Sequence, residues 1–114
     1  MSTTMHAAIT PGRTAVITGG ASGIGLAAAV RFASLGLNVV IADLDTAALR
    51  AAAARISGAG SGEVLTVQTN VSRKEDVERL KDKAWHAFGD VAVLMNNAGI
   101  GKGGGPFENY KGWQ

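Results

Sequence analysis

Three glycines, Gly19, Gly23 and Gly25, stand in a stretch that carries very little side-chain volume. The apolar segment Thr14–Thr18 leads into this stretch, and a segment with helical spacing follows it. Free backbone amides at a strand-to-helix junction, together with the partial positive charge of a helix N-terminus, bind anions such as a pyrophosphate. A tight turn that needs positive φ would explain one or two of the glycines, but not their spacing. We therefore interpret the stretch as a phosphate-binding loop, in which Gly25 lets the helix pack near the strand.

An acidic residue follows the second apolar segment of the chain. Asp43 ends the run VVIAD, and a carboxylate at this distance from a glycine loop can accept hydrogen bonds from an adenosine ribose. An isolated aspartate would be explained more simply as a solvated loop residue, but its place after the second strand favours the ribose contact. Asp43 would also repel a 2′-phosphate, and Leu44 supplies no cation for one. The sequence therefore predicts NAD as the cofactor in preference to NADP.

Short apolar segments alternate with longer segments of helical periodicity. We expect strands at 14–18, 38–42, 63–69 and 91–95, and helices at 26–35, 46–56 and 72–88. This alternation predicts an α/β fold, the first half of a Rossmann-like doubly wound parallel sheet with helices on both faces. Right-handed crossovers give the strand order 3-2-1-4. A ligand site is then expected at the switch point between strands 1 and 4, beyond their carboxyl ends.

Each expected helix has a stripe of apolar residues that should face the sheet. Ser72 and Glu75 have the spacing of a capping box, in which both side chains bond to free amides at the start of the third helix. The stripes consist of Ala28, Phe32 and Leu35 in the first helix, Leu49, Ala53 and Ile56 in the second, and Val77, Leu80, Ala84 and Phe88 in the third.

With Thr18 in front, the glycine stretch TGGASGIG resembles the cofactor fingerprint of the short-chain dehydrogenase/reductase family. The stretches NVS at 70–72 and NNAG at 96–99 also match this family, after the third and fourth expected strands. The family usually has aspartate where Asn70 stands, and the resemblance implies that the Asn70 oxygen accepts a hydrogen bond from the adenine amino group. It also implies that the Asn97 amide ties the fourth strand to neighbouring backbone. The cofactor-binding residues that the resemblance implies are Gly19, Ser22, Gly23, Ile24, Gly25, Asp43, Leu44, Asn70, Val71, Asn97, Ala98 and Gly99.

The resemblance implies an NAD-dependent oxidoreductase that transfers a hydride between an alcohol and a ketone, but the family's catalytic residues do not match here. That chemistry uses a Tyr-x-x-x-Lys pair and an upstream serine, whereas the one tyrosine, Tyr110, is followed four residues later by Gln114. We expect residues 1–114 to be a dinucleotide-binding domain truncated before the catalytic segment, inactive alone and homo-oligomeric when full length. The alternatives are a free-standing nucleotide-binding module without chemistry and a flavodoxin-like phosphate binder, which Asp43 and NNAG disfavour.

Two further features are not expected to do chemistry. Gly99, Gly101 and Gly104 also have the spacing Gly-x-Gly-x-x-Gly, but no helical segment follows them, and this motif needs a helix N-terminus. We interpret residues 101–105 as a loop beside the site. His6 and His86 stand in no pattern with a partner residue, so surface or capping roles are expected for them.

Composition narrows the classes of function. The 114 residues carry a net charge of +2, with scattered basic residues, which does not indicate a nucleic-acid partner. There is no cysteine, so a disulfide framework and a thiolate metal site are excluded, and we expect no metal. No signal-peptide core or membrane-length apolar run is present in the sequence, so we expect a cytoplasmic protein without a membrane partner.

Overall fold

The computed structural model describes residues 9–97. The four strands in this range form one parallel sheet with the order β3-β2-β1-β4, as the sequence predicts. Helices alternate with the strands along the chain. The elements are β1 (Thr14–Thr18), α1 (Gly23–Ser34), β2 (Asn38–Asp43), α2 (Thr46–Ser57), β3 (Val64–Gln68), α3 (Lys74–Phe88) and β4 (Val93–Asn96).

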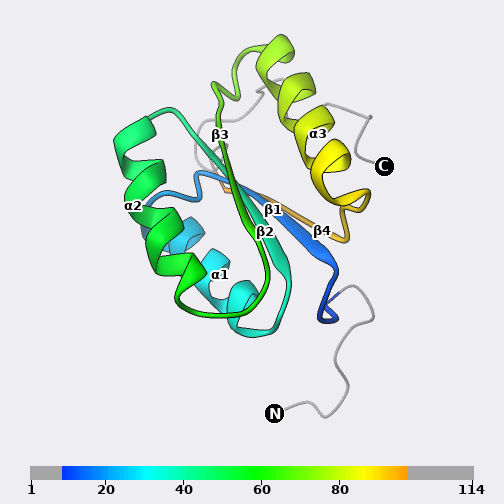
Figure 1. Cartoon of the computed structure of the whole chain (residues 1–114). Coiled ribbons are helices and arrows are strands. Elements are labelled where there is room, and N and C mark those ends of the chain that lie inside the picture. Colours follow the sequence, from blue (N-terminus) through cyan, green and yellow to red (C-terminus); the bar gives the residue numbers. More distant parts are fainter. Residues whose placement is uncertain (1–8, 98–114) are drawn as a thin grey trace.

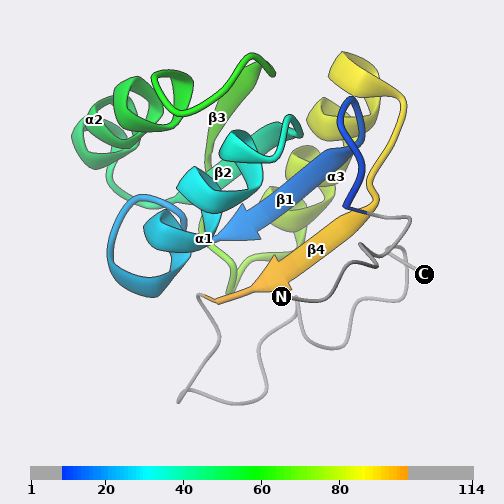
Figure 2. The same ribbon diagram turned by 90° about the horizontal axis from the view of Figure 1, so that it is seen from below.

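Helices cover both faces of the sheet. Figure 1 shows α1 and α2 on one side of the sheet and α3 on the other. Figure 2 shows β1 and β4 side by side and running in the same direction. Because successive side chains of a strand point to opposite faces, Ile17 joins the core under α1 and α2, whereas Val16 joins the core under α3. This two-sided burial explains why β1 is apolar at consecutive positions and fully buried.

The buried stripes of α1 and α2 differ from the expected ones, whereas the stripe of α3 is confirmed, with its last residue, Phe88, only partly buried against the core. The smallest residues of α1 lie closest to the sheet, because a close helix-to-sheet approach leaves no room for larger side chains there. Phe32 packs against the margin of this core and is only partly buried. The buried residues are Gly25, Ala29 and Ala33 in α1 (in place of Ala28, Phe32 and Leu35), Leu49, Ala52 and Ile56 in α2 (Ala52 in place of Ala53), and Val77, Leu80 and Ala84 in α3.

The start of α3 also differs from the prediction. The N-cap residue is Arg73, and its side chain makes no cap hydrogen bond. The backbone N–H and the hydroxyl of Ser72 both donate to Asn70 Oδ1, at 3.0 and 2.5 Å. The capping box between Ser72 and Glu75 is therefore wrong, because Asn70 engages the serine in a local turn before the helix begins.

An ion pair closes the amino end of the sheet. Arg13 precedes β1 and Asp90 precedes β4, and Arg13 Nε lies 2.8 Å from Asp90 Oδ2. A second hydrogen bond of 3.3 Å joins Arg13 Nη2 to Asp90 Oδ1. The Asp90 carboxylate raises the pKa of the Arg13 guanidinium through this hydrogen-bonded pairing. The two side chains thus join segments 77 residues apart in the sequence.

Candidate functional site

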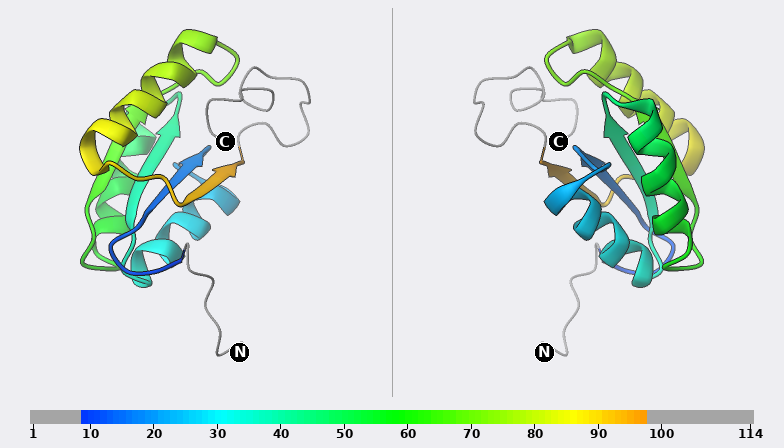
Figure 3. Two further views of the ribbon diagram at one scale, coloured as in Figure 1. Left: turned by 90° about the vertical axis from the view of Figure 1, so that its right-hand side faces the viewer. Right: turned by 90° about the vertical axis from the view of Figure 1, so that its left-hand side faces the viewer.

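The carboxyl ends of the four strands lie at one edge of the sheet, because all four strands are parallel. Four of the segments predicted to bind a cofactor follow these ends: the glycine loop after β1, Asp43 at the end of β2, Asn70 after β3 and Asn97 after β4. Figure 3 shows from two sides that the strands run toward the same end of the sheet. The fold therefore brings together residues that are up to 78 positions apart in the sequence.

The glycine loop leaves β1 and enters α1 with little side-chain volume. Gly19 and Gly23 both have positive φ, at 68° and 58°, a region that favours glycine. The Gly19 N–H donates to the carbonyl of Ala42 at 2.7 Å, which ties the loop to the end of β2. A Cβ atom added to Gly23 would meet no protein atom within 4 Å. The first amides of α1 therefore begin beside open space, where a ligand phosphate can approach the backbone.

Gly25 has a different reason to lack a side chain. A Cβ atom there would overlap the carbonyl of Gly19 and would lie 2.9 Å from Asn97 Nδ2. The same Asn97 amide donates a hydrogen bond to Gly19 O at 3.3 Å. The absence of a side chain at Gly25 therefore allows the first turn of α1, the loop and the end of β4 to pack against one another.

Asp43 points back toward the glycine loop. Its Oδ2 accepts a hydrogen bond from the Ala21 N–H at 3.2 Å, and its Oδ1 accepts one from the Leu44 N–H at 2.8 Å. The carboxylate is partly buried, whereas Leu44 beside it is 59% exposed. Because a carboxylate has about four lone-pair positions, it retains capacity for a further donor such as a ribose hydroxyl.

A pocket of about 240 Å³ opens between the ends of β2 and β3. Among its lining residues is Asn70, whose side-chain oxygen is already engaged by the two hydrogen bonds from Ser72. An amide oxygen accepts two hydrogen bonds in its lone-pair directions, so this oxygen is not a free acceptor for an adenine amino group in the described arrangement. The pocket is lined by Ala42, Asp43, Leu44, Thr69, Asn70 and Val71.

Sequence reasoning did not identify the residues that support this pocket. Asp76, in the first turn of α3, accepts a hydrogen bond from the Asn70 N–H at 2.9 Å, and it lies 3.9 Å from Arg79 Nη2. Gln68 Nε2 donates to the carbonyl of Leu44 at 3.1 Å. The sequence did contain one sign of this role, because Asp76 is an acidic residue in the first turn of a helix and stands six positions after Asn70. Thr69 is buried and bonds to the Val67 carbonyl at 2.9 Å, which no sequence pattern indicated.

Some predicted features lie outside the described residues. These are His6, Ala98, Gly99, Tyr110, the second glycine motif at 99–104 and the loop expected at 101–105. Within residues 9–97, no group of three or more His, Cys, Asp or Glu side chains is placed so that it could hold a metal ion. In the same range, no helix has both the length and the apolar character that crossing a membrane requires.

Known proteins with similar sequences include dehydrogenases. A family model described as short chain dehydrogenase matches residues 13–112. A 1-deoxy-11-beta-hydroxypentalenate dehydrogenase of Streptomyces exfoliatus is 48% identical over 88 residues, which are 77% of this chain and 32% of that protein. A 3beta-hydroxysteroid dehydrogenase 2 of Eggerthella lenta is 41% identical over 100 residues, 88% of this chain and 38% of that protein. The chain thus spans about a third of the length of these relatives.

Solved structures with a similar fold include complexes with NAD and with NADP. A short chain dehydrogenase/reductase from Burkholderia phymatum in complex with NAD has a TM-score of 0.70 and 44% identity, covering 74% of this chain and 30% of its own. A metagenomic short-chain oxidoreductase in complex with NADP has a TM-score of 0.75 and 35% identity, covering 92% of this chain and 47% of its own. Because the family model covers residues 13–112 and the described fold agrees with these structures, the chain belongs to the short-chain dehydrogenase/reductase family.

Proposed function

We propose that the chain binds a nicotinamide dinucleotide across the carboxyl edge of the sheet. The open space beside Gly23, at the amide-rich start of α1, carries this proposal, because a backbone phosphate site needs that missing side chain. The pyrophosphate would lie on the loop with Ser22 and Ile24, and the adenosine would extend past Asp43 into the pocket that Leu44, Asn70 and Val71 help to line. Asn97 would hold the end of β4 against the loop, and Ala98 and Gly99, which follow it in the sequence, are small residues that would leave room for the cofactor.

The proposed cofactor is NAD in preference to NADP. Asp43 would face a 2′-phosphate with a negative charge, and like charges in a poorly hydrated site cost several kcal/mol. Leu44 supplies no compensating cation, and none of the described residues that line the pocket is lysine or arginine. The two similar structures named above hold NAD and NADP respectively, so the preference follows from these residues and not from the relatives.

Titration with both cofactors tests the preference. The 114-residue chain, and the protein encoded by the reading frame that contains it, would each be titrated with NAD and with NADP in a calorimeter. Asp43→Asn removes the charge but keeps an oxygen that can accept from Ala21 or Leu44, so it should narrow the gap between the two affinities. Asp43→Ala also leaves the Ala21 N–H without its acceptor, so it should weaken the binding of both cofactors. Equal or tighter NADP binding by the unaltered protein would overturn the preference.

The proposed activity is hydride transfer between an alcohol and a ketone, with this chain as the cofactor-binding part of the enzyme. Bound NAD would supply the hydride acceptor, and the chain's own residues would hold and orient it. The 114-residue chain alone should show no turnover, because the Tyr-x-x-x-Lys pair is absent from it and acid–base catalysis contributes about 10²–10⁴-fold. An assay of NADH formation with secondary alcohols tests this. Turnover by the chain that disappears in Tyr110→Phe would assign catalysis to Tyr110 instead.

A further inference from the structure

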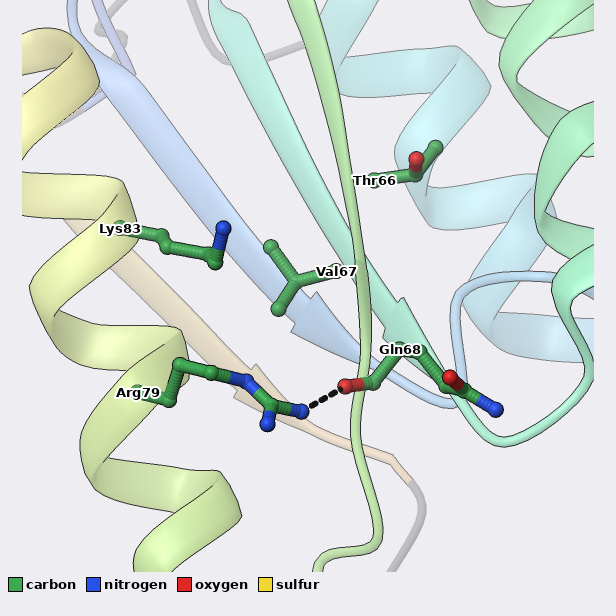
Figure 4. Close-up of a pocket in the computed structure, with 5 residues that line it drawn as sticks. All are labelled: Thr66, Val67, Gln68, Arg79 and Lys83. Atoms are coloured by element: carbon green, nitrogen blue, oxygen red, sulfur yellow. Dashed lines mark hydrogen bonds between the residues drawn. The ribbon is translucent and has the colours of Figure 1, made fainter.

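A groove lies along the outer edge of β3, on the α3 side of the sheet. Two cavities of about 370 and 490 Å³ form it, and they adjoin because Arg79 and Lys83 line both. Figure 4 shows these two side chains extending from α3 toward β3, and the side chain of Val67 extending from β3 toward α3. The first cavity is lined by Thr66, Val67, Gln68, Arg79 and Lys83, and the second by Leu65, Arg79, Asp82, Lys83, His86 and Ala87.

The backbone of β3 offers unpaired groups to this groove. β3 is the outermost strand of the described sheet and pairs there with β2 alone. Glu63 O and Thr69 N bond to β2, at 2.9 and 2.8 Å. Because the backbone groups of alternate residues in a strand point to the same neighbour, the N–H and C=O groups of the even-numbered residues between these two point away from β2. The Gln68 carbonyl confirms this direction, because it accepts from Arg79 Nη2 at 2.6 Å. The N–H and C=O of Thr66 and the N–H of Gln68 therefore face the open edge.

The two ends of the groove differ in chemistry. Lys83 is exposed, and within the described residues its ammonium group has no hydrogen-bond or ion-pair partner, whereas Arg79 is half-exposed and holds the Gln68 carbonyl. In the second cavity, Leu65 and Ala87 give an apolar surface to which the stem of Lys83 adds, and the polar side chains of Asp82 and His86 also line it. An occupant should therefore carry a negative charge near Lys83 and an apolar side chain near Leu65.

The length of the groove favours a peptide over a small anion. Residues 65–68 span about 10 Å at roughly 3.3 Å per residue of strand. Residues 79–87 of α3 span about 12 Å at roughly 1.5 Å per residue. Three or four extended residues fill such a distance, whereas a single small anion would occupy only the part of the groove beside Arg79 and Lys83. A strand that pairs with β3 would also use the free backbone groups of Thr66.

We propose that this groove binds an extended acidic segment of a partner protein, which adds a strand to β3. In that strand an acidic side chain would face Lys83, and an apolar side chain two residues away would lie against Leu65 and Ala87. A second copy of this chain is a poorer occupant, because edge-to-edge pairing of β3 would bring the Arg79 and Lys83 cations of both copies together. The proposal does not depend on the cofactor site, since neither Lys83 nor Thr66 lines the pocket between β2 and β3.

A peptide titration followed by amide NMR tests the proposal on the 114-residue chain. The probe is an acetylated and amidated pentapeptide with glutamate second, valine fourth and threonine elsewhere. We expect shifts of the Thr66 and Gln68 amides, and an affinity that falls several-fold as salt is raised. Lys83→Glu should abolish binding, and Lys83→Gln, which keeps the stem, should weaken it. Lys74→Glu reverses an exposed charge at the start of the same helix and should leave the affinity unchanged.

Four outcomes would overturn the proposal. Equal binding of a peptide with lysine in place of glutamate would remove the charge argument. Identical shifts with acetate alone would show a small-anion site. Slow hydrogen exchange of the Thr66 and Gln68 amides without peptide, and no shifts with it, would show that the edge is already covered. Concentration-dependent dimerisation that Lys83→Glu strengthens would assign the groove to a second copy. Circular dichroism of each variant checks that the fold is retained.

Discussion

The side-chain amide of Asn97 donates a hydrogen bond to the carbonyl of Gly19 across 3.3 Å, and this bond joins the end of β4 to the glycine loop. The same carbonyl is the atom that a side chain on Gly25 would strike. The loop therefore owes its position to packing and hydrogen bonds within the chain.

The two glycines at the start of α1 should respond differently to alanine. Gly25→Ala forces a Cβ atom against the Gly19 carbonyl and should destabilise the fold by about 1–3 kcal/mol, which is typical of overpacking. Gly23→Ala meets no protein atom, so its cost is that of a left-handed residue, about 1–2 kcal/mol, while its Cβ atom blocks the proposed phosphate. Urea unfolding and NAD titration measure the two effects. Normal NAD binding by Gly23→Ala would show that the phosphate lies elsewhere.

Asn97 should stabilise the glycine loop through the hydrogen bond that its side-chain N–H donates. Asn97→Ala removes the bond to Gly19 and should cost about 1 kcal/mol of stability, with a parallel loss of NAD affinity as the loop loosens. Asn97→Asp should be worse than alanine, because it places a carboxylate oxygen against the Gly19 carbonyl. The midpoints of urea unfolding give the order of the two variants. If aspartate were tolerated as well as asparagine, the hydrogen bond would not be what holds the loop.

Asp76 should support the pocket between β2 and β3 from outside it. Asp76→Ala leaves the Asn70 N–H without its acceptor, and we expect a loss of about 1 kcal/mol in stability together with weaker NAD binding. Glu75→Ala is the matched control, since it removes a neighbouring acid from the same helical turn without touching Asn70. Any loss of stability that both variants share would come from the lost interaction of an acidic residue with the helix dipole, which contributes about 0.3–1 kcal/mol. Equal NAD affinities in the two variants would contradict the role of Asp76.

The ion pair at the amino end of the sheet should contribute to stability but not to cofactor binding. Arg13→Gln breaks both hydrogen bonds to Asp90 and should lower the thermal unfolding midpoint, whereas Arg13→Lys should retain part of the effect. The hydrogen bond and charge of Asp90 raise the pKa of Arg13, so the stability that the pair contributes is present throughout the pH range in which an arginine is ordinarily protonated. It is lost only when pH rises through the raised pKa of the folded state. The test is therefore by mutation, with Arg55→Gln as a control at an exposed arginine in α2. An unchanged midpoint in Arg13→Gln would show that the pair is energetically neutral.

The 114-residue chain should self-associate through β4. This strand lies at the edge of the described sheet, and Leu94 on its α3 side is 36% exposed. Apolar edge strands without a charge or proline tend to pair with other chains. Sedimentation should show concentration-dependent association that Leu94→Lys reduces, whereas Leu44→Lys, at an exposed leucine away from this edge, should not. A monomer with slowly exchanging amides at 93–96 would show that this edge is already covered.

The strands, their order and the family motifs were predictable from the sequence. Apolar runs of strand length are local features, and right-handed crossovers restrict how such strands can be arranged. The apolar stripe of α3 was also predictable, because charged residues on the other faces of this helix distinguish them clearly from the apolar face. The alanine-rich helices α1 and α2 lack that contrast, so Ala29 and Ala52 could not be distinguished from their neighbours as the buried positions. The fourth strand, expected at 91–95, is Val93–Asn96, because strand ends follow from pairing with β1.

The sequence by itself determined which residue types stand at the ends of the strands, and therefore the class of ligand that we propose. Only the tertiary structure decided what those residues bond to in the described chain. Asp43 bonds to an amide 22 residues away and Asn97 to a carbonyl 78 residues away, whereas the Asn70 oxygen is taken by its neighbour Ser72. The long-range partners depend on the distances between segments in the folded chain, and the local one on a competition between turn and helix cap. Residue spacing alone encodes neither.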